Sequence, residues 1–512
     1  MAMGRPRYDG FWGRRVDRRH FLRLAALSAG TAALVAACGR GPSSRPATFP
    51  AETPTPTGPF PRVSGPIEGG RRGMPFNYPA VDLASRGYVA QEFFLEGEAT
   101  SYRPAPGATL GNDGLWRAEP ADTARYRTRI LVVRPLDDSR FNGTVLVNWQ
   151  NVTAGFEIGT VGEGEILRGY AWVGVSAQRV GVEGFASPEA RSPLGLGTDQ
   201  HLKAWDPERY GSLQHPGDPY SYDIFTQAAR AVGPQRPRTT PDPMGGLTVR
   251  RLVATGLSQS AARLRTYINA VHPLVGVFQG FIPYLDFGWG IRLDEQSVPD
   301  VSGVDPRIRV PTVIRQDQPT PVMVVNSETE TVSYYAVRQP DSPSFRFWEV
   351  AGTSHAALPR GTQLGGVTAP NWLSVTPVYH AAVRHMHNWL VRGTPPPVLP
   401  RIEVEPGNPP RIRRDARGNA LGGIRLPELE APIGEHRGVG EGGSLLAILA
   451  GYFRPFTCRE LASLYTSREA FVRAYQQAVD AGVAAGYILP EDAAAMKEAA
   501  ARTDIFASCP AG

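Results

Sequence analysis

Arg251-Leu-Val-Ala-Thr-Gly256-Leu-Ser258-Gln-Ser260-Ala-Ala-Arg-Leu264 joins an apolar run to a helical pattern through a Gly-x-Ser-x-Ser pentapeptide. The pattern predicts a strand, a sharp turn over Ser258, and a helix. Small residues around Ser258 permit such a turn, which lifts the serine Oγ clear of the sheet and frees the next backbone N–H to stabilise an oxyanion. Ser260 stands where glycine is the commonest residue. An ordinary serine at a strand–helix turn remains the alternative, so the rest of the chain must decide.

The N-terminal residues 1–37 are predicted to be a signal peptide. Asp17-Arg-Arg-His-Phe-Leu-Arg23 resembles the twin-arginine export motif, and the apolar run 24–37 is too short and too rich in Ala and Gly for a membrane span. Leu34-Val-Ala-Ala-Cys38 resembles a bacterial lipobox, in which a lipid is attached to the cysteine. We therefore expect an exported lipoprotein of the cell envelope, anchored to the membrane through Cys38. Plain cleavage after Ala37, with Cys38 incidental, is the open alternative.

The positive charge of the chain is concentrated in this segment. Residues 1–37 hold seven Arg and two Asp, a net charge of +5, whereas the whole chain carries +6, so residues 38–512 carry about +1. Nucleic-acid-binding domains present many uncompensated basic side chains. We therefore expect no nucleic-acid partner.

The other two cysteines form an even pair in a chain predicted to be exported. Cys458 and Cys509 bracket a helical C-terminal segment, and disulfides persist outside the cytoplasm. A structural disulfide is the favoured interpretation, and two buried free thiols are the alternative. The cysteines and histidines show no zinc-ligand spacing, and the His-Glu-x-x-His motif is absent from the sequence. We expect no metal and no cofactor.

The chain divides by composition into four parts. After the signal peptide, residues 38–70 are rich in Pro, Gly, Ser and Thr and are predicted to be a linker. Residues 71–400 alternate strands and helices, which favours an α/β fold with a mostly parallel sheet covered on both faces. Residues 401–512 are predicted to be a C-terminal extension with helices near 459–500 that packs on the preceding domain. The predicted strands are 128–133, 143–149, 171–176, 251–255, 276–282, 322–326 and 346–350, and the predicted helices are 222–232, 261–270 and 378–391.

Two long irregular stretches, 184–219 and 284–318, are predicted where a lid or a pocket wall would lie. They contain aromatic side chains, including Trp205, Phe287 and Trp289. A substrate wall and ordinary packing are both compatible with these residues.

Two further side chains follow Ser258 in the order that an activated serine needs. A serine hydroxyl requires a base to take its proton and an acid to orient that base. The strand 321–326 leads into Glu328 and Glu330, and the strand 345–350 leads into His355. His355 is the only one of the nine histidines that directly follows a predicted strand beyond the acid. Glu330 is the preferred acid because it falls on the acid position of a strand–turn–acid–x–apolar pattern, and Glu328 is the alternative.

The oxyanion donors are expected to be backbone N–H groups. Gln259 follows the nucleophile directly, and the loop after the strand 143–149 provides a second donor. The register of that loop leaves Asn151 and Val152 as candidates.

Several of these motifs together resemble a family of exported bacterial α/β-hydrolase domains. The resemblance covers roughly residues 71–500 and implies the α/β-hydrolase fold and a Ser-acid-His triad. It does not imply a substrate. The motifs are Gly256-Leu-Ser-Gln-Ser-Ala261, Arg168-Gly-Tyr-Ala-Trp-Val-Gly-Val-Ser-Ala-Gln-Arg179, Tyr210-Gly-Ser-Leu213 and Ala351-Gly-Thr-Ser-His-Ala356.

The expected activity is that of a serine hydrolase acting on a small carboxylic ester. Ser258 attacks, His355 moves the proton, Glu330 orients the imidazole, and the Gln259 N–H stabilises the oxyanion. Amide and lactone substrates need the same groups and are not separated by sequence. A surface-binding lipoprotein that keeps the fold without turnover is the alternative from another functional class. The sequence makes no prediction of oligomeric state.

Overall fold

The computed structural model describes residues 58–162, 164–185, 192, 194, 200–237, 240–293, 308–359, 361–362, 367, 369–503 and 509. The predicted signal peptide, Cys38 and most of the predicted linker lie outside these residues, so export and lipidation stay predictions. None of the helices in the described ranges has the length and hydrophobicity needed to cross a membrane.

The centre of the molecule is a nine-stranded sheet with the strand order β1-β2-β3-β5-β4-β6-β7-β10-β11. Pairings are antiparallel from β1 to β5 and parallel from β5 to β11. The mostly parallel α/β sheet is therefore confirmed. All seven predicted strands are present, and β1 and β2 were not predicted. The strands are β1 (Arg62–Ser64), β2 (Tyr88–Pro104), β3 (Ala118–Pro135), β4 (Thr144–Trp149), β5 (Ala171–Val175), β6 (Arg251–Leu257), β7 (Gly280–Tyr284), β10 (Val322–Ser327) and β11 (Phe345–Val350).

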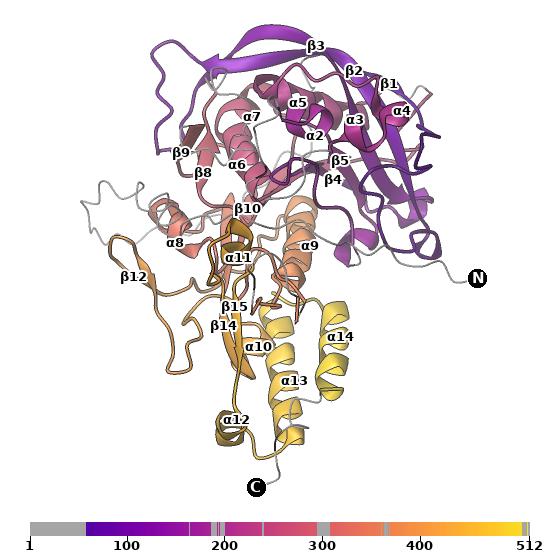
Figure 1. Cartoon of the computed structure of the whole chain (residues 1–512). Helices are drawn as coiled ribbons and strands as arrows, with labels where there is room; N and C mark the ends of the chain where they lie inside the picture. Colours follow the sequence, from indigo (N-terminus) through magenta and orange to yellow (C-terminus); the bar gives the residue numbers. More distant parts are fainter. Residues whose placement is uncertain are drawn as a thin grey trace.

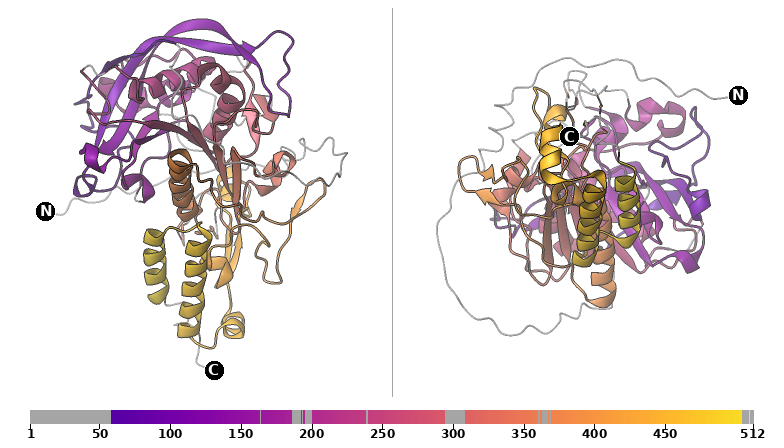
Figure 2. Two further views of the ribbon diagram at one scale, coloured as in Figure 1. Left: turned by 180° about the vertical axis from the view of Figure 1, so that it is seen from behind. Right: turned by 90° about the horizontal axis from the view of Figure 1, so that it is seen from below.

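Helices lie on both sides of the central part of the sheet, as Figures 1 and 2 show. Successive side chains of a strand point to opposite faces, and in β3 Ile130 and Val132 enter one hydrophobic cluster while Leu131 and Val133 enter another. Helices α5 (Ser221–Val232) and α6 (Gln259–Thr266) contribute to the first cluster. Helix α9 (Thr376–Arg392) contributes to the second. This double cover explains the near-continuous apolar runs of the central strands.

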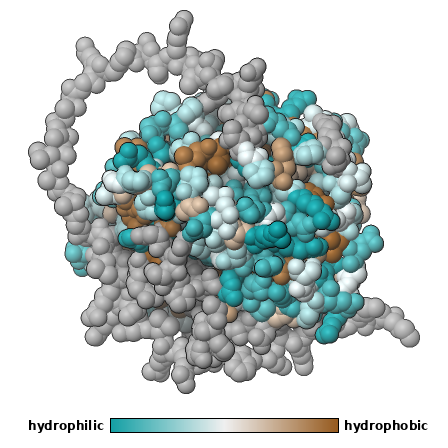
Figure 3. All heavy atoms as spheres, turned by 90° about the horizontal axis from the view of Figure 1, so that it is seen from above, coloured by the Kyte–Doolittle hydropathy of each residue, from teal (hydrophilic) through white to brown (hydrophobic). Residues whose placement is uncertain are grey.

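Seen from the side of β2 and β3, the described surface is mainly hydrophilic, with hydrophobic residues in small separate groups (Figure 3). The described part of this face therefore offers no large apolar area for docking.

Two predicted boundaries downstream of Ser258 differ from the structure by several residues. The helix after Ser258 ends at Thr266 and continues as a π-helical turn, η5 (Tyr267–Val271), and a short helix α7 (His272–Val275). Gly276 then ends the helix with a left-handed φ of 56°, so the next strand begins at Gly280 rather than at 276.

The two stretches predicted to be irregular also contain short regular elements. Residues 200–220 form α3 (Leu202–Trp205), α4 (Pro207–Tyr210) and η4 (Asp218–Tyr220). The second stretch contains the antiparallel pair β8 (Trp289–Ile291) and β9 (Arg309–Pro311). The other short helices are η1 (Ala84–Arg86), η2 (Asp138–Arg140), η3 (Glu165–Leu167), α2 (Arg179–Glu183), α8 (Thr331–Tyr334) and η8 (Tyr335–Val337).

A buried ionic network ties the segment around α4 to the sheet. Glu92 of β2 accepts hydrogen bonds from Arg129 of β3 (3.0 Å) and from Arg209 of α4 (2.6 Å). Arg129 also binds Glu157 (2.5 Å), which lies in the segment that follows β4. Because all four side chains are buried, each charge needs its partner. The network therefore holds both α4 and the segment after β4 against the sheet.

The C-terminal extension packs against the same core. Residues of α10 and α13 share the second hydrophobic cluster with Met386 and Trp389 of α9. A histidine–carboxylate contact, His380–Asp492 (2.9 Å), and an ion pair, Arg384–Glu491 (2.9 Å), join α9 to α14. The elements of the extension are β12 (Val404–Glu405), β13 (Arg411–Ile412), α10 (Pro427–Glu430), β14 (Gly434–Arg437), α11 (Leu445–Leu449), β15 (Tyr452–Pro455), α12 (Cys458–Leu464), α13 (Arg468–Ala485) and α14 (Pro490–Ala501).

Cys458 and Cys509 are joined by a disulfide in the structure. The bond links the start of α12 to the chain that follows α14, closing a segment with a sequence separation of 51 residues. It thereby connects the two ends of the helical part of the extension.

Candidate active site

Ser258 is the single residue between β6 and α6, and its backbone is strained. Its φ of 59° and ψ of −114° are rare for a residue with a side chain. The strain is held on both sides, because Ser258 N–H donates to the Tyr284 carbonyl (2.9 Å) and the Ser258 carbonyl accepts from Ala262 N–H (3.2 Å). The side chain is half-buried. This is the strand–turn–helix geometry that the pentapeptide predicts.

Gly256 and Ser260, the small residues on either side of the turn, are required for different physical reasons. A Cβ on Gly256 would lie 2.8 Å from the Ser260 carbonyl oxygen, so only glycine lets the chain double back so closely. Ser260 is buried, and its Oγ accepts from Leu257 N–H (2.8 Å) and donates to the Leu257 carbonyl (2.9 Å). The hydroxyl therefore closes the turn across the strained residue, which explains how serine serves at a position where glycine is commonest.

The acid and the histidine meet at the same edge of the sheet. Strands β6, β10 and β11 run parallel, so the loops at their carboxyl ends lie at one edge, where α/β proteins place their sites. His355 Nδ1 lies 2.7 Å from Glu330 Oε1. Glu330 is fully buried, and the His355 side chain is 9% exposed. A carboxylate accepts hydrogen bonds, so with Glu330 ionised His355 Nδ1 is the donor in this contact and Nε2 is the ring nitrogen left for another partner.

The second oxygen of Glu330 is held by its own turn. Oε2 accepts from the N–H (2.8 Å) and the hydroxyl (2.7 Å) of Ser327. In the described part of the chain, no hydrogen bond joins the Ser258 hydroxyl to His355. Catalytic contacts of this kind often tighten only when substrate is bound.

Glu328, the alternative acid, is buried and directed elsewhere. Its Oε1 accepts from Arg414 (2.5 Å) and from Gly438 N–H (3.0 Å), and its Oε2 accepts from Gly352 N–H (2.7 Å). Both carboxylate oxygens are thus occupied by groups other than the His355 imidazole.

The predicted oxyanion residues lie around the tight turn Leu257-Ser258-Gln259, which is called the elbow below. Gln259 lies in the first turn of α6, where backbone N–H groups lack a helical acceptor, and its N–H has no partner among the described residues. Its side chain donates to Gln178 (2.9 Å) and accepts from Val152 N–H at the long distance of 3.4 Å. The Asn151 side chain donates to the Leu257 carbonyl (2.8 Å), which fixes the loop after β4 against the elbow.

A column of stacked groups continues outward from His355. The Phe287 ring stacks on the imidazole with centroids 5.1 Å apart, and Trp289 stacks on Phe287 at 5.1 Å. The Arg309 guanidinium lies 4.3 Å from the centroid of the Trp289 ring. Two of the aromatics noted in the sequence therefore line the histidine side of the site, where one of them restricts the imidazole directly.

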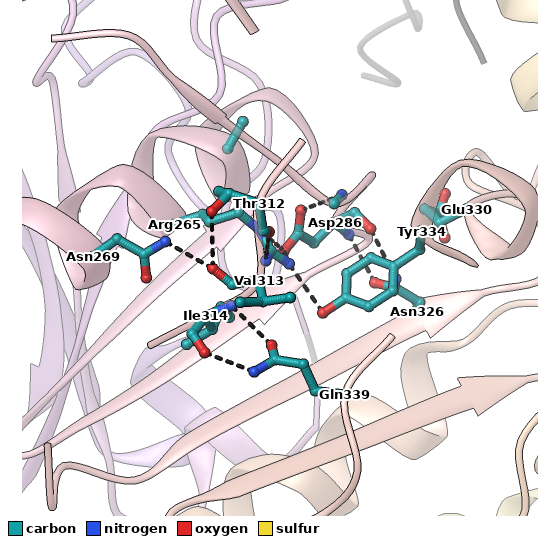
Figure 4. Close-up of polar contacts among 12 residues, drawn as sticks. Arg265, Asn269, Asp286, Thr312, Val313, Ile314, Asn326, Glu330, Tyr334 and Gln339 are labelled. Atoms are coloured by element: carbon teal, nitrogen blue, oxygen red, sulfur yellow. Dashed lines mark hydrogen bonds and ion pairs between the residues drawn. The ribbon is translucent and has the colours of Figure 1, made fainter. Parts of the chain in front are cut away.

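The buried ion pair between Arg265 of α6 and Asp286 was missed by sequence reasoning (Figure 4). Arg265 of α6 binds Asp286 (2.5 Å), the Tyr334 hydroxyl (2.9 Å) and the Thr312 carbonyl (2.6 Å). Burial alone would lower the pKa of Arg265, but the Asp286 carboxylate raises it above its usual range. Tyr334 N–H in turn donates to the Glu330 carbonyl (2.8 Å). The pair thus connects the helix behind Ser258 to the turn that carries the acid.

The described residues contain no group of three or more His, Cys, Asp or Glu side chains that could hold a metal ion.

Residues 63–498 match the family described as "Alpha/beta hydrolase domain", and the chain belongs to this family. Curated proteins give no match to the chain. Solved structures with a similar chain path include oligopeptidase B from Trypanosoma brucei (12% identity, TM-score 0.26, 52% of this chain and 33% of that one). Dipeptidyl peptidase 4 from Porphyromonas gingivalis (13%, 0.26, 52% and 33%) and the esterase Est22 (11%, 0.24, 52% and 74%) are further examples.

The chain spans 33% of the length of each of these two peptidases. Identities and TM-scores this low carry nothing about substrate.

Replacing Ser260 by Ala is expected to destabilise the elbow. The change leaves the partly buried Leu257 N–H without its acceptor, which costs about 1–3 kcal/mol. We expect a lower midpoint of urea unfolding for Ser260→Ala. Ser463→Ala is the matched control, because Ser463 is exposed and its hydroxyl bonds a helix carbonyl. Equal midpoints for the two variants would mean that the Ser260 hydroxyl does not hold the turn.

Proposed function

We propose that the protein is a serine hydrolase that cleaves carboxylic esters through an acyl-enzyme. The observation that carries the proposal is the contact of buried Glu330 with His355 Nδ1 at the sheet edge where the Ser258 elbow lies. Acyl transfer requires a base near the serine hydroxyl and an acid that orients that base, and the His355–Glu330 pair supplies both roles in this proposal.

The reaction proceeds in two balanced halves. Ser258 Oγ forms a bond to the ester carbonyl carbon as its proton moves to His355 Nε2, and the carbonyl oxygen becomes an oxyanion that the Gln259 N–H stabilises. The intermediate collapses by breaking the bond to the alcohol oxygen, which takes the proton from His355. Water then attacks the acyl-enzyme with His355 as base, releasing the carboxylic acid and free Ser258. Glu330 stays ionised and holds the imidazolium.

Ester substrates are proposed in preference to amides because the alcohol of an ester leaves more easily than the amine of an amide. An ester therefore depends less on proton donation from His355. Amide and lactone hydrolysis would use the same groups. A catalytically silent binding protein is the contrary outcome of the experiments below.

We also propose that the protein acts outside the cytoplasm, tethered by a lipid on Cys38. The proposal rests on the N-terminal sequence, and the Cys458–Cys509 disulfide supports it because disulfides persist in oxidising compartments. Mass spectrometry of the mature N-terminus should find an acylated Cys38. An unmodified N-terminus at another residue would contradict the anchor.

A fluorophosphonate probe should label wild-type protein at Ser258. The probe reacts with a hydroxyl only where a base activates it, so Ser258→Ala and heat-denatured protein should remain unlabelled. Peptide mapping identifies the modified residue. Absence of label on Ser258 in folded protein would reject the serine-hydrolase proposal in favour of a binding role.

The two acidic residues should differ in their effect on turnover. Glu330→Gln removes the charge that stabilises the imidazolium, and we expect kcat on p-nitrophenyl esters to fall by about 10³–10⁴-fold. Glu328→Gln should cost far less, because Glu328 does not contact the imidazole. A larger loss for Glu328→Gln than for Glu330→Gln would transfer the role of the acid.

A further inference from the structure

The C-terminal extension reaches into the candidate active site at Gly438, just after β14. Gly438 N–H donates to Glu328 Oε1 (3.0 Å), and its carbonyl accepts from the Thr329 hydroxyl (2.5 Å). A Cβ at Gly438 would lie 2.6 Å from Thr329 N, so the extension lies against the backbone of the acid turn. Glu328 and Thr329, the two residues that Gly438 contacts, immediately precede Glu330.

Arg414 supplies the charge at this contact. Its guanidinium lies 2.5 Å from Glu328 Oε1, and the pair joins a fully buried carboxylate to an arginine whose side chain is 25% exposed. Removing one member of a buried pair leaves the other charge uncompensated. Glu328 therefore depends on Arg414 for its position.

The same contacts continue to the histidine loop. Gly352 N–H donates to Glu328 Oε2 (2.7 Å), and His355 N–H donates to the Thr329 hydroxyl (2.9 Å). Ala356 N–H donates to the carbonyl of Leu449 in α11 (2.9 Å). The loop that carries His355 is thus held at three backbone N–H groups, and each hydrogen bond leads to the extension directly or through Glu328 and Thr329.

The sheet edge provides a fourth attachment. Ile424 pairs in parallel with Val350 at the end of β11, with hydrogen bonds from Ala351 N–H to the Ile424 carbonyl (2.9 Å) and from Ile424 N–H to the Glu349 carbonyl (2.7 Å). The extension therefore follows the strand from which the histidine loop departs. The helices α13 and α14 dock elsewhere, against α9.

We propose that Arg414, Ile424, Gly438 and Leu449 form a C-terminal clamp that sets the distance and angle between His355 and Glu330. Arg414 is a positioning residue that acts through Glu328 and touches no reacting atom. The proposal rests on the proposed hydrolase function, because it concerns the same acid–histidine pair. Misplacement of a catalytic group by about 1 Å costs up to about 10²-fold in rate.

Arg414→Ala should lower kcat on p-nitrophenyl esters by about 10–100-fold with little change in KM. Because Arg414 acts through Glu328 in this proposal, we expect substrate binding to be spared. Because the Arg414 side chain is partly exposed, added guanidinium should enter the vacated space and restore much of the lost kcat. Methylammonium at the same ionic strength should not, because it lacks the planar fork. Arg413→Ala is the matched control: the neighbouring arginine pairs with Glu403 on the surface, and its loss should leave kcat unchanged.

A second pair of variants keeps the test decisive if Arg414→Ala does not fold. Thr329→Val keeps the shape but removes the hydroxyl between Gly438 and His355 N–H, and it should lower kcat, whereas Thr329→Ser should recover most of it. Wild-type kcat in Arg414→Ala, a loss confined to KM, or equal kcat in the two Thr329 variants would overturn the clamp. The fluorophosphonate label separates the two proposals: wild-type protein labelled at Ser258 with an unaffected Arg414→Ala rejects the clamp alone, and unlabelled wild-type protein rejects the function.

Discussion

The strained backbone of Ser258 is the constraint on which the rest of the site depends. A side-chain-bearing residue adopts a positive φ only where its surroundings leave no other path. Here three contacts fix the conformation. The chain packs closely against Gly256, the Ser260 hydroxyl bonds Leu257 across the turn, and Ser258 N–H bonds the carbonyl of Tyr284 on the adjacent strand. The same turn places Ser258 between β6 and α6 and leaves the Gln259 N–H without an acceptor among the described residues. The path of the chain and the position of the candidate nucleophile are thus set by one turn.

Three arginine–carboxylate pairs, each with a buried carboxylate, hold the segments that carry the site. Arg265 with Asp286 supports the elbow helix, Arg129 with Glu157 supports the segment after β4, and Arg414 with Glu328 supports the acid turn. Arginine suits this task because its planar fork binds several acceptors at fixed angles. Such pairs add little net stability over apolar packing, but each specifies one arrangement of its loop. Their placement around the site, at the ends of parallel strands, connects loops that are distant in sequence.

The central strands of the sheet were predicted correctly because each is a nearly continuous apolar run bounded by turn residues. Sequence reasoning missed the edge strand β1, which has three residues, and the long strand β2 beside it, which mixes charged and apolar residues, including the buried Glu92. It also treated 284–318 as irregular, although β8 and β9 pair there, because their three-residue strands leave no periodic signal. In the site, the order of Ser258, an acid and His355 was readable from strand ends. The partner of each acid was not readable, since Glu328 and Glu330 are both acids two residues apart.

By itself the sequence determined the fold class, the candidate nucleophile, and the order of acid and histidine, because local periodicity and turn chemistry are written in neighbouring residues. Only the tertiary structure decided that Glu330 contacts the imidazole while Glu328 binds Arg414 and Gly438. It also decided that residues more than 80 positions further along the chain hold the acid turn, as the Glu328–Arg414 separation of 86 residues shows. Contacts of this kind depend on which loops the sheet order brings together, and no local pattern encodes that.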